Sequence, residues 1–151
     1  MSGEGQLLVG EVCHQAIVAT EWSPDHVGGM TLGADPVAYA IAREATRRGC
    51  AIDAFTVRKA AKAHGTRRRI EGCLQVGGRA VVVDDSVTTG GSLLAAARAV
   101  VDFGAEVVGV LALVDREEGA RELLAEAGYD FRPVFAAREL LADPDGSVHQ
   151  P

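Results

Sequence analysis

The chain has 151 residues, of which 48% are hydrophobic and 24% are charged, and its formal net charge is -6. This length fits one domain, expected to span residues 1–151, and the acidic balance disfavours binding to nucleic acid or to an anionic membrane. The sequence has no apolar run long enough to span a bilayer, no secretory signal pattern, and three widely spaced cysteines. We therefore expect a soluble, cytoplasmic protein with reduced thiols.

The hydrophobic pattern alternates between helices and short strands along the chain. It predicts a helix at about 7–20, an apolar stretch with glycines at 27–30, and a helix at 35–48. Strands at 54–57 and 80–83 come next, then a helix at 92–103, a strand at 107–114 and a helix at 117–127. A strand at 131–135 and a short helix at 138–141 follow, and residues from about 143 to 151 are expected to fray. This alternation predicts the α/β class, with a parallel sheet covered by helices on both faces.

Several residues mark the predicted helix ends. Asp35 suits the N-cap of the second helix, and Pro36 suits its first turn, where a missing N–H costs nothing. Gly49 is a plausible C-cap of the same helix. Gly104 and Gly128 are expected to end the two later helices.

The segment Val81–Ser92, VVVDDSVTTGGS, joins a predicted strand to a predicted helix. Ligands of parallel sheets bind at the carboxyl ends of the strands. Glycines and hydroxyl groups at such a place form a phosphate cradle, because backbone N–H groups can converge on the anion and the helix start adds positive partial charge. Asp84 and Asp85 would repel a phosphate unless they meet sugar hydroxyls or a divalent cation. The segment therefore predicts a site for a phosphorylated sugar, with magnesium as the expected cation.

The segment lacks the two common nucleotide-binding motifs. A nucleotide P-loop does not fit, because GxxxxGK[ST] is absent and the turn contains no lysine, and G-x-G-x-x-G is absent as well. The remaining alternative is that Asp84 and Asp85 only end a strand and that Gly90-Gly91 forms an ordinary turn.

Basic residues gather after the predicted strand at 54–57: Arg58, Lys59, Lys62, His64, Arg67, Arg68 and Arg69. Cations at a pyrophosphate leaving group stabilise the transition state, because the negative charge of that group grows as its bond to carbon breaks. A loop that carries them could close over the ligand and exclude water. The alternative is a solvated charged loop or a weak nucleic-acid patch, and it applies above all to 67–69.

These motifs resemble those of the type I phosphoribosyltransferases and, more narrowly, the orotate phosphoribosyltransferases. Val81–Ser92 resembles the family's ribose-phosphate signature, residues 55–66 with 70–72 resemble its strand and catalytic loop, and residues 28–36 resemble its pyrophosphate-binding loop. Arg116, in Val114-Asp115-Arg116, matches an arginine that pairs with the orotate carboxylate. The likeness runs from about Leu7 to Leu141. It implies a three-layer type I phosphoribosyltransferase fold, a central parallel sheet flanked by helices.

The resemblance also implies an enzyme, a pentosyltransferase of pyrimidine biosynthesis. It would transfer ribose 5-phosphate from 5-phosphoribosyl 1-pyrophosphate (PRPP) to orotate, giving orotidine 5′-phosphate and pyrophosphate. The catalytic residues would be Lys62, His64, Asp84 and Asp85. The substrate-binding residues would be Arg58, Lys59, Lys62, His64, Asp84, Asp85, Ser86, Val87, Thr88, Thr89, Gly90, Gly91, Ser92 and Arg116.

Specific roles follow from the same resemblance. The two aspartates would hold the ribose hydroxyls, Thr88 to Ser92 the 5′-phosphate, and Arg116 the orotate carboxylate, with Thr88 also touching the base. Magnesium would bind mainly through the substrate, without a metal site of the protein's own. The protein would be a homodimer with shared active sites, in which Arg58, Lys62 and His64 reach the neighbouring subunit's site. Another interpretation of Arg116 is a strand-end arginine paired with Asp115 or Glu117.

Two departures from the family pattern keep alternatives open. The family's N-terminal segment, a hood over the base, has no counterpart before the first predicted helix, so the sequence is either shortened or that of a hoodless homologue. Leu32 stands where some members carry a lysine. The alternatives are a phosphoribosyltransferase for another base, such as a purine, and a non-catalytic regulator that binds PRPP. The basic loop and Arg116 disfavour the first, and the lack of a DNA-binding region disfavours the second.

Overall fold

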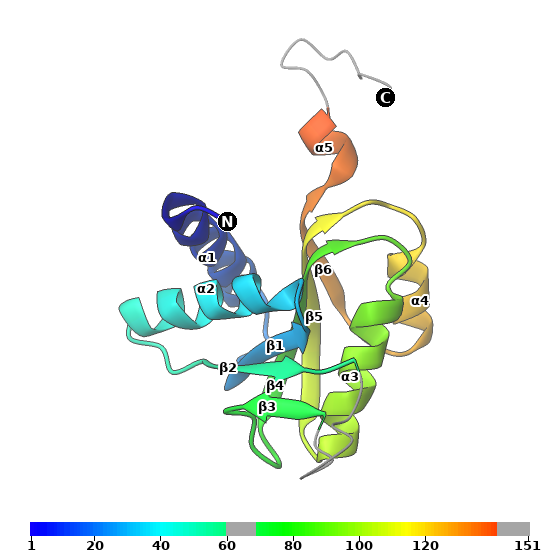
Figure 1. Ribbon diagram of the computed structural model, residues 1–151. Helices are drawn as coiled ribbons and strands as arrows, with labels where there is room; N and C mark the ends of the chain where they lie inside the picture. The colour runs from blue at the N-terminus through cyan, green and yellow to red at the C-terminus, as the bar shows by residue number, and fades with distance from the viewer. Residues whose placement is uncertain (60–68, 142–151) are drawn as a thin grey trace.

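The computed structural model describes residues 1–59 and 69–141 of the chain. Within them, six strands form one sheet in the order β3-β2-β1-β4-β5-β6 (Figure 1). The strands are β1 His26–Met30, β2 Asp53–Val57, β3 Ile70–Gly72, β4 Arg79–Val87, β5 Glu106–Asp115 and β6 Phe131–Ala136. The helices are α1 Gly3–Val18, α2 Ala34–Arg47, α3 Gly91–Phe103, α4 Ala120–Glu126 and α5 Ala137–Leu141. The predicted α/β class is confirmed.

The sheet is parallel except at one edge. The pairs β1–β2, β1–β4, β4–β5 and β5–β6 are parallel, whereas β3 runs antiparallel to β2. The predicted parallel sheet flanked by helices is confirmed, and β3, which the sequence pattern does not reveal, adds one antiparallel strand at its edge. Three residues are too few to show an alternating pattern, so the backbone ladder with β2 is what makes this segment a strand.

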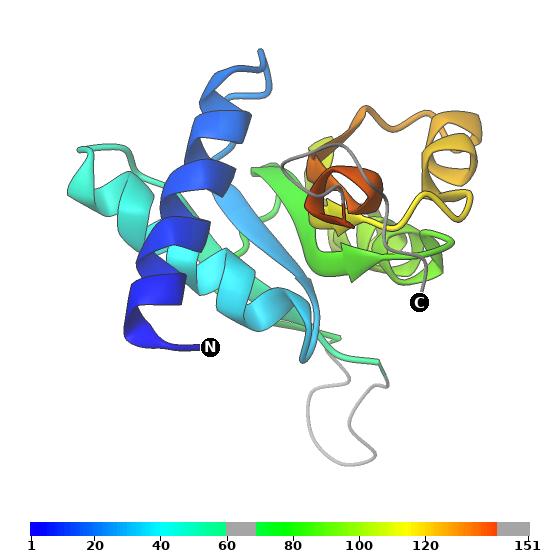
Figure 2. The same cartoon turned by 90° about the horizontal axis from the view of Figure 1, so that it is seen from above.

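The two faces of the sheet carry separate clusters of buried side chains. On the face covered by α1 and α2, the cluster includes Ile17, Ile41, Val81 and Val83. On the face covered by α3 and α4, it includes Phe55, Val82, Leu93, Val100 and Leu124. Figure 2 shows the two pairs of helices on opposite sides of the sheet. Because the middle of β4 is buried on both faces, Ala80–Val83 form an uninterrupted apolar run.

The strand β4 is longer than predicted. Its apolar run ends at Val83, but pairing with β5 continues through Asp84, Ser86 and Val87. The acid pair therefore lies on the strand, and the turn to α3 is confined to Thr88–Gly90. A backbone ladder extends wherever the neighbouring strand continues, whatever the polarity of the side chains.

The start of α2 also differs from the prediction. The helix begins at Ala34 with Gly33 as its N-cap, so the assignment of Asp35 as the N-cap is wrong. Pro36 does lie in the first turn, and Gly49, with φ of +79°, directly follows the C-cap Arg48. The later helix α4 begins at Ala120, after Gly119 with φ of +103°, and not at residue 117 as predicted.

Some predictions fall on residues that are not described. The fraying tail from about 143 to 151 lies outside the described residues, and so do Lys62, His64, Arg67 and Arg68. Across 1–59 and 69–141, no helix combines the length and apolar character needed to cross a membrane.

Candidate active site

Three connections meet at the carboxyl edge of the sheet. They are the β1–α2 turn at 31–33, the β4–α3 turn at 88–90 and the β5–α4 turn at 116–119. Because β1, β4 and β5 are parallel neighbours, their carboxyl ends share one edge. The sequence motifs at 28–36, 81–92 and 114–116 are thereby brought together.

The acid pair on β4 consists of one buried and one exposed carboxyl group. Asp84 is 8% exposed, and its Oδ1 accepts a hydrogen bond of 3.0 Å from the Asp85 N–H. Asp85 is exposed, and its Oδ1 accepts a hydrogen bond of 2.7 Å from the Ser86 N–H. Burial raises the pKa of Asp84 from 3.8 to about 6, and the charge of Asp85 acts in the same direction. The site therefore holds a carboxylate that would gain from a hydroxyl donor or a nearby positive charge.

The β1–α2 turn lies directly against this acid pair. A Cβ atom on Gly33 would lie 2.9 Å from Oδ1 of Asp85 and 3.0 Å from Oδ1 of Asp84. Gly29 allows a similar approach, since a Cβ there would lie 2.0 Å from the carbonyl oxygen of Val83. Glycine at these positions lets two motifs that are far apart in the sequence meet at one point.

Three helices begin at this edge without a side-chain cap. The N-caps are Gly33 of α2, Gly90 of α3 and Gly119 of α4, and none of these helix starts has a side-chain cap hydrogen bond. At the start of α1, by contrast, the side chain of Ser2 accepts a hydrogen bond from the Gly5 N–H. The first N–H groups of a helix have no partner within it, so an uncapped start can bind an anion. Thr89 and Ser92 are exposed beside the start of α3.

Within the predicted phosphate segment, Val87 behaves differently from its neighbours. Its side chain is 4% exposed and packs in the core against α3 and α4. Its carbonyl oxygen accepts a hydrogen bond of 2.9 Å from the Arg116 N–H. Val87 therefore has only its main chain at the site, where it joins the ends of β4 and β5.

Arg116 is exposed at the end of β5. Its Nε lies 3.1 Å from Oε1 of Glu118. The partners considered from the sequence are engaged elsewhere, since Glu117 pairs with Arg138 and Asp115 lies 3.7 Å from Arg121. The Arg116 guanidinium thus pairs with the exposed carboxylate of Glu118, which the carboxylate of a ligand could replace.

Asp115, one residue before Arg116, is a polar group that sequence patterns do not predict as important. It is 2% exposed, and its Oδ1 accepts a hydrogen bond of 2.8 Å from the Glu117 N–H. Such a bond from an aspartate to the backbone two residues on fixes a turn. Asp115 therefore holds the turn that carries Arg116, and its position directly before that arginine is the only signal in the sequence.

The described part of the basic loop is its base. The Arg58 N–H donates to the Arg69 carbonyl oxygen at 2.7 Å, so the chain before and after residues 60–68 is joined by a hydrogen bond. The Arg58 guanidinium donates to Oε1 of Glu71 at 2.7 Å. Lys59 is exposed, and its positive charge acts to lower the pKa of Asp84. Lys59 is thus electrostatically linked to the acid pair, whereas Lys62 and His64 lie outside the described residues.

A cavity of about 460 Å³ lies between the β1–α2 turn and the edge strands β2 and β3. The polar residues that line it are Thr31, Asp35, Tyr39, Thr56, Arg58 and Glu71. Leu32, at the tip of the turn, is 81% exposed. A leucine offers no charge at that point, so an anion there would depend on the backbone N–H groups of the turn.

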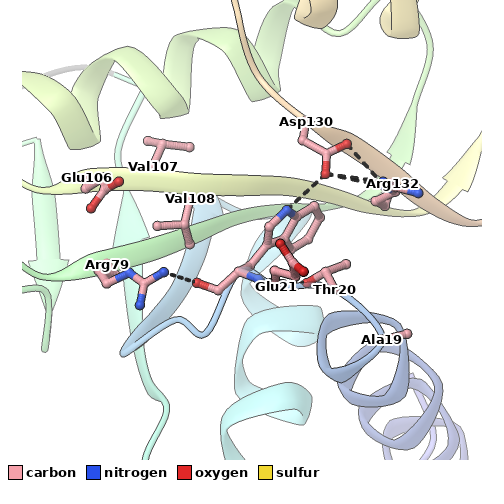
Figure 3. A pocket seen from close by; sticks show the side chains of 10 residues that line it. Ala19, Thr20, Glu21, Arg79, Glu106, Val107, Val108, Asp130 and Arg132 are labelled. Carbon is pink, nitrogen blue, oxygen red and sulfur yellow. Dashed lines mark hydrogen bonds and ion pairs between the residues drawn. The ribbon is translucent and has the colours of Figure 1, made fainter.

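A second cavity, of about 580 Å³, lies at the opposite, amino edge of the sheet (Figure 3). Three of its charged residues, Arg79, Asp130 and Arg132, contact Trp22 or one another. The Trp22 indole N–H donates to Asp130 at 3.1 Å, and the Arg79 guanidinium donates to the Trp22 carbonyl oxygen at 2.7 Å. Arg132 pairs with Asp130 at 3.1 Å. Arg79, Asp130 and Arg132 are thus engaged within the protein, and the acid pair and glycine turns of the carboxyl edge have no counterpart among the residues that line this cavity.

Comparison with known proteins gives a consistent result. The phosphoribosyl transferase domain family matches residues 7–127. The chain is 46% identical over 138 residues to an orotate phosphoribosyltransferase of Aquifex aeolicus. This alignment covers 91% of this chain and 74% of the relative. The chain is 49% identical over 144 residues to an orotate phosphoribosyltransferase of Streptomyces avermitilis. This alignment covers 95% of this chain and 78% of the relative.

The fold is similar to a solved structure of the same kind of enzyme. That structure is the orotate phosphoribosyltransferase of Mycobacterium tuberculosis H37Rv in complex with 5-phospho-alpha-D-ribosyl 1-diphosphate, which is PRPP. The TM-score is 0.79 at 44% sequence identity, and the match covers 89% of this chain and 75% of that chain. Sequence and fold thus agree on one family.

Proposed function

This chain belongs to the phosphoribosyltransferase family and, within it, to the orotate phosphoribosyltransferases, and from that premise we propose how its own residues carry out the reaction. The reaction is the transfer of ribose 5-phosphate from PRPP to orotate. A ring nitrogen of orotate forms a bond to the anomeric carbon, the bond from that carbon to pyrophosphate breaks, and pyrophosphate leaves with the electron pair. The product is orotidine 5′-phosphate.

One observation carries this proposal above the others. The acid pair of β4, the glycine turn before α2 and the uncapped start of α3 lie together at one edge of the sheet. A phosphate group, a ribose diol and a second anionic group are the chemical features that such a combination accepts. PRPP contains all three.

The acid pair would act on the ribose. Asp84 and Asp85 accept hydrogen bonds from the ribose hydroxyls and stabilise the positive charge that develops on the ring as pyrophosphate leaves. The raised pKa of Asp84 supports this role, because a poorly solvated carboxylate interacts more strongly with a nearby positive charge. Thr88, Thr89, Gly90, Gly91 and Ser92 would bind the 5′-phosphate through N–H and hydroxyl donors at the start of α3.

Arg116 would bind the carboxylate of orotate. In the unliganded chain its Nε lies 3.1 Å from Oε1 of Glu118, so orotate would take the place of a carboxylate that is already there. Asp115 supports this role by fixing the turn, and the Arg116 N–H bond to Val87 ties it to the phosphate segment. Orotate already offers an anionic pyrimidine, so the protein needs no general base for the attack.

The basic loop would act on the leaving group. Arg58, Lys59, Lys62 and His64 would stabilise pyrophosphate as its negative charge grows. In the proposed homodimer, Arg58, Lys62 and His64 reach the site of the neighbouring subunit, while Lys59 serves the other side of the shared site. The bond between the Arg58 N–H and the Arg69 carbonyl oxygen supports a loop with a fixed base.

The residues at this edge fit a magnesium ion that is held mainly through the substrate. Across the described ranges there is no group of three or more His, Cys, Asp or Glu residues that could hold a metal ion by itself. Asp84 and Asp85 offer carboxylate oxygens, which hard cations prefer, and the phosphate and hydroxyl oxygens of PRPP would complete the set. When bound, magnesium would offset part of the negative charge on the pyrophosphate group.

A pyrophosphate-release assay tests the proposed function. The chain is incubated with PRPP and magnesium and with orotate, uracil, hypoxanthine or no base. Release with orotate alone supports the proposal, and release with another base would replace it by a different phosphoribosyltransferase. Tight binding of PRPP without release with any base would indicate a non-catalytic sensor. The same assay tests base selectivity.

A further inference from the structure

Asp35 joins the β1–α2 turn to the end of β2. The Thr31 hydroxyl donates to Oδ2 of Asp35 at 2.7 Å, and the Thr56 hydroxyl donates to Oδ1 at 3.0 Å. The Tyr39 hydroxyl lies 3.3 Å from Oγ1 of Thr56. Because Thr56 uses its proton toward Asp35, Tyr39 is the donor in this last contact. Both carboxylate oxygens of Asp35 are thus engaged, one toward the turn and one toward the strand.

The backbone of the turn is also hydrogen-bonded, to the end of β2 and to the start of α2. The Thr31 N–H donates to the Val57 carbonyl oxygen at 2.9 Å, and the Asp35 N–H donates to the Leu32 carbonyl oxygen at 3.2 Å. Among the residues that the structure describes, the N–H groups of Leu32 and Gly33 have no acceptor. The anchors therefore fix the turn while leaving two donors for a ligand.

The fixed turn lies where the substrate would bind. Gly33 is in contact distance of both carboxyl groups of the acid pair, so a small displacement of the turn changes the space above Asp84 and Asp85. The other anchored element, β2, leads directly into Arg58 and Lys59. Asp35 thus connects the turn on one side of the acid pair with the strand that carries the basic loop.

We propose that Asp35 is a positioning residue for pyrophosphate, which holds the turn 31–33 and the end of β2 in fixed relation to each other. This inference rests on the proposed function. Asp35 itself does not contact the substrate, because a carboxylate beside pyrophosphate would repel it and both its oxygens already accept hydroxyl bonds. Its contribution is to hold the N–H groups of Leu32 and Gly33 in fixed relation to Lys59, the basic residue that the proposed function does not send to the neighbouring subunit's site.

The test compares kinetic constants of Asp35→Ala, Asp35→Asn, Thr31→Val and Thr56→Val with those of the unmodified chain. We expect Asp35→Ala to raise KM for PRPP about tenfold, since charged hydrogen bonds of this kind are lost, and to leave KM for orotate within about twofold. Asp35→Asn can still accept one hydroxyl bond and should recover part of the loss. The two valine variants keep the side-chain shape and should each reproduce part of the effect in a folded protein.

Controls separate positioning from general stability. Asp53→Ala removes an exposed carboxylate at the other end of β2 and should leave both KM values unchanged. In the reverse reaction, KM for pyrophosphate should rise in Asp35→Ala as KM for PRPP does. Equal changes in KM for PRPP and orotate, or no change in either, would overturn the role of Asp35.

A failure of the proposed function is recognised separately. If the unmodified chain releases no pyrophosphate with any base, the proposed reaction fails, and calorimetric titration with PRPP and with pyrophosphate still tests Asp35. Weaker binding of both ligands by Asp35→Ala and Thr31→Val, with unchanged binding by Asp53→Ala, supports the positioning role. Equal affinities in all these proteins would refute it.

Discussion

Both edges of the sheet carry charged residues, but these residues have different partners at the two edges. Three of those at the amino edge contact Trp22 or one another, whereas the carboxyl edge has groups that a ligand could bind. At the amino edge, Arg79, Asp130 and Arg132 bind one another or Trp22, around a cavity of about 580 Å³. At the carboxyl edge, Asp84 is buried with a pKa raised to about 6, and the starts of α2 and α3 have no side-chain caps. The volume of a cavity therefore says less about function than the polar groups that the protein leaves unsatisfied.

The same contrast separates stability from activity. At the amino edge, hydrogen bonds and an ion pair join Trp22, Arg79, Asp130 and Arg132, whereas the carboxyl edge has a carboxylate that is costly to bury. Such local cost is common where a ligand supplies the missing partner. Substitutions at the carboxyl edge should therefore change turnover, and substitutions at the amino edge should change the free energy of unfolding.

The largest expected effect is on turnover at the carboxyl edge. Asp84→Asn keeps the acceptor for the Asp85 N–H but removes the charge that would stabilise the developing positive charge on the ribose. We expect kcat/KM to fall about a hundredfold or more. Glu106→Gln, at the amino edge, is the matched control, and its kcat/KM should stay within about twofold of that of the unmodified chain. Steady-state kinetics with orotate and PRPP measure both, and equal losses in the two variants would remove the proposed distinction.

The same Asp84→Asn variant should be more stable than the unmodified chain at high pH. The folded-state pKa of Asp84 lies near 6 and the unfolded value near 3.8, so the stability contribution of this group is fully present below the unfolded value and is lost as pH rises through about 6. We expect the variant to gain about 3 kcal/mol at pH 8 and nothing below about pH 4. Urea unfolding at several pH values measures this, and a gain that does not depend on pH would contradict it.

At the amino edge the expected effect is on stability alone. Trp22→Phe removes the indole N–H that donates to Asp130 and part of a ring that packs on Gly109. We expect a loss of about 1–2 kcal/mol in unfolding free energy, with KM for both substrates unchanged. Chemical denaturation and kinetics of the same preparation test this. A selective change in KM would mean that the amino edge takes part in catalysis.

The smallest expected effect concerns the ion pair at Arg116. Glu118→Gln removes the carboxylate that pairs with the Arg116 guanidinium, so the orotate carboxylate no longer has to displace it. Both side chains are about half exposed, and exposed pairs contribute little, so KM for orotate should fall about twofold. KM for PRPP should not change. A rise in KM for orotate would indicate that Glu118 supports the arginine in its binding position.

Much of the fold and part of the site follow from local sequence. The apolar run before Asp84, the hydroxyl-rich turn and the helix after Gly90 are read from neighbouring residues, because a strand–turn–helix phosphate cradle is built from one continuous segment. The family resemblance follows from the same segments and is confirmed by the comparisons. The roles of the site residues remain predictions.

The tertiary structure alone decides what depends on distant partners. Pairing with β5 extends β4 through the acid pair, and pairing with β2 makes β3 a strand. The raised pKa of Asp84 arises from burial, and the proposed role of Asp35 depends on hydrogen bonds from the Thr31 and Thr56 hydroxyls, the second of which lies on β2. Local chemistry determines which residues can bind PRPP, whereas the packing of separate strands determines which of them meet.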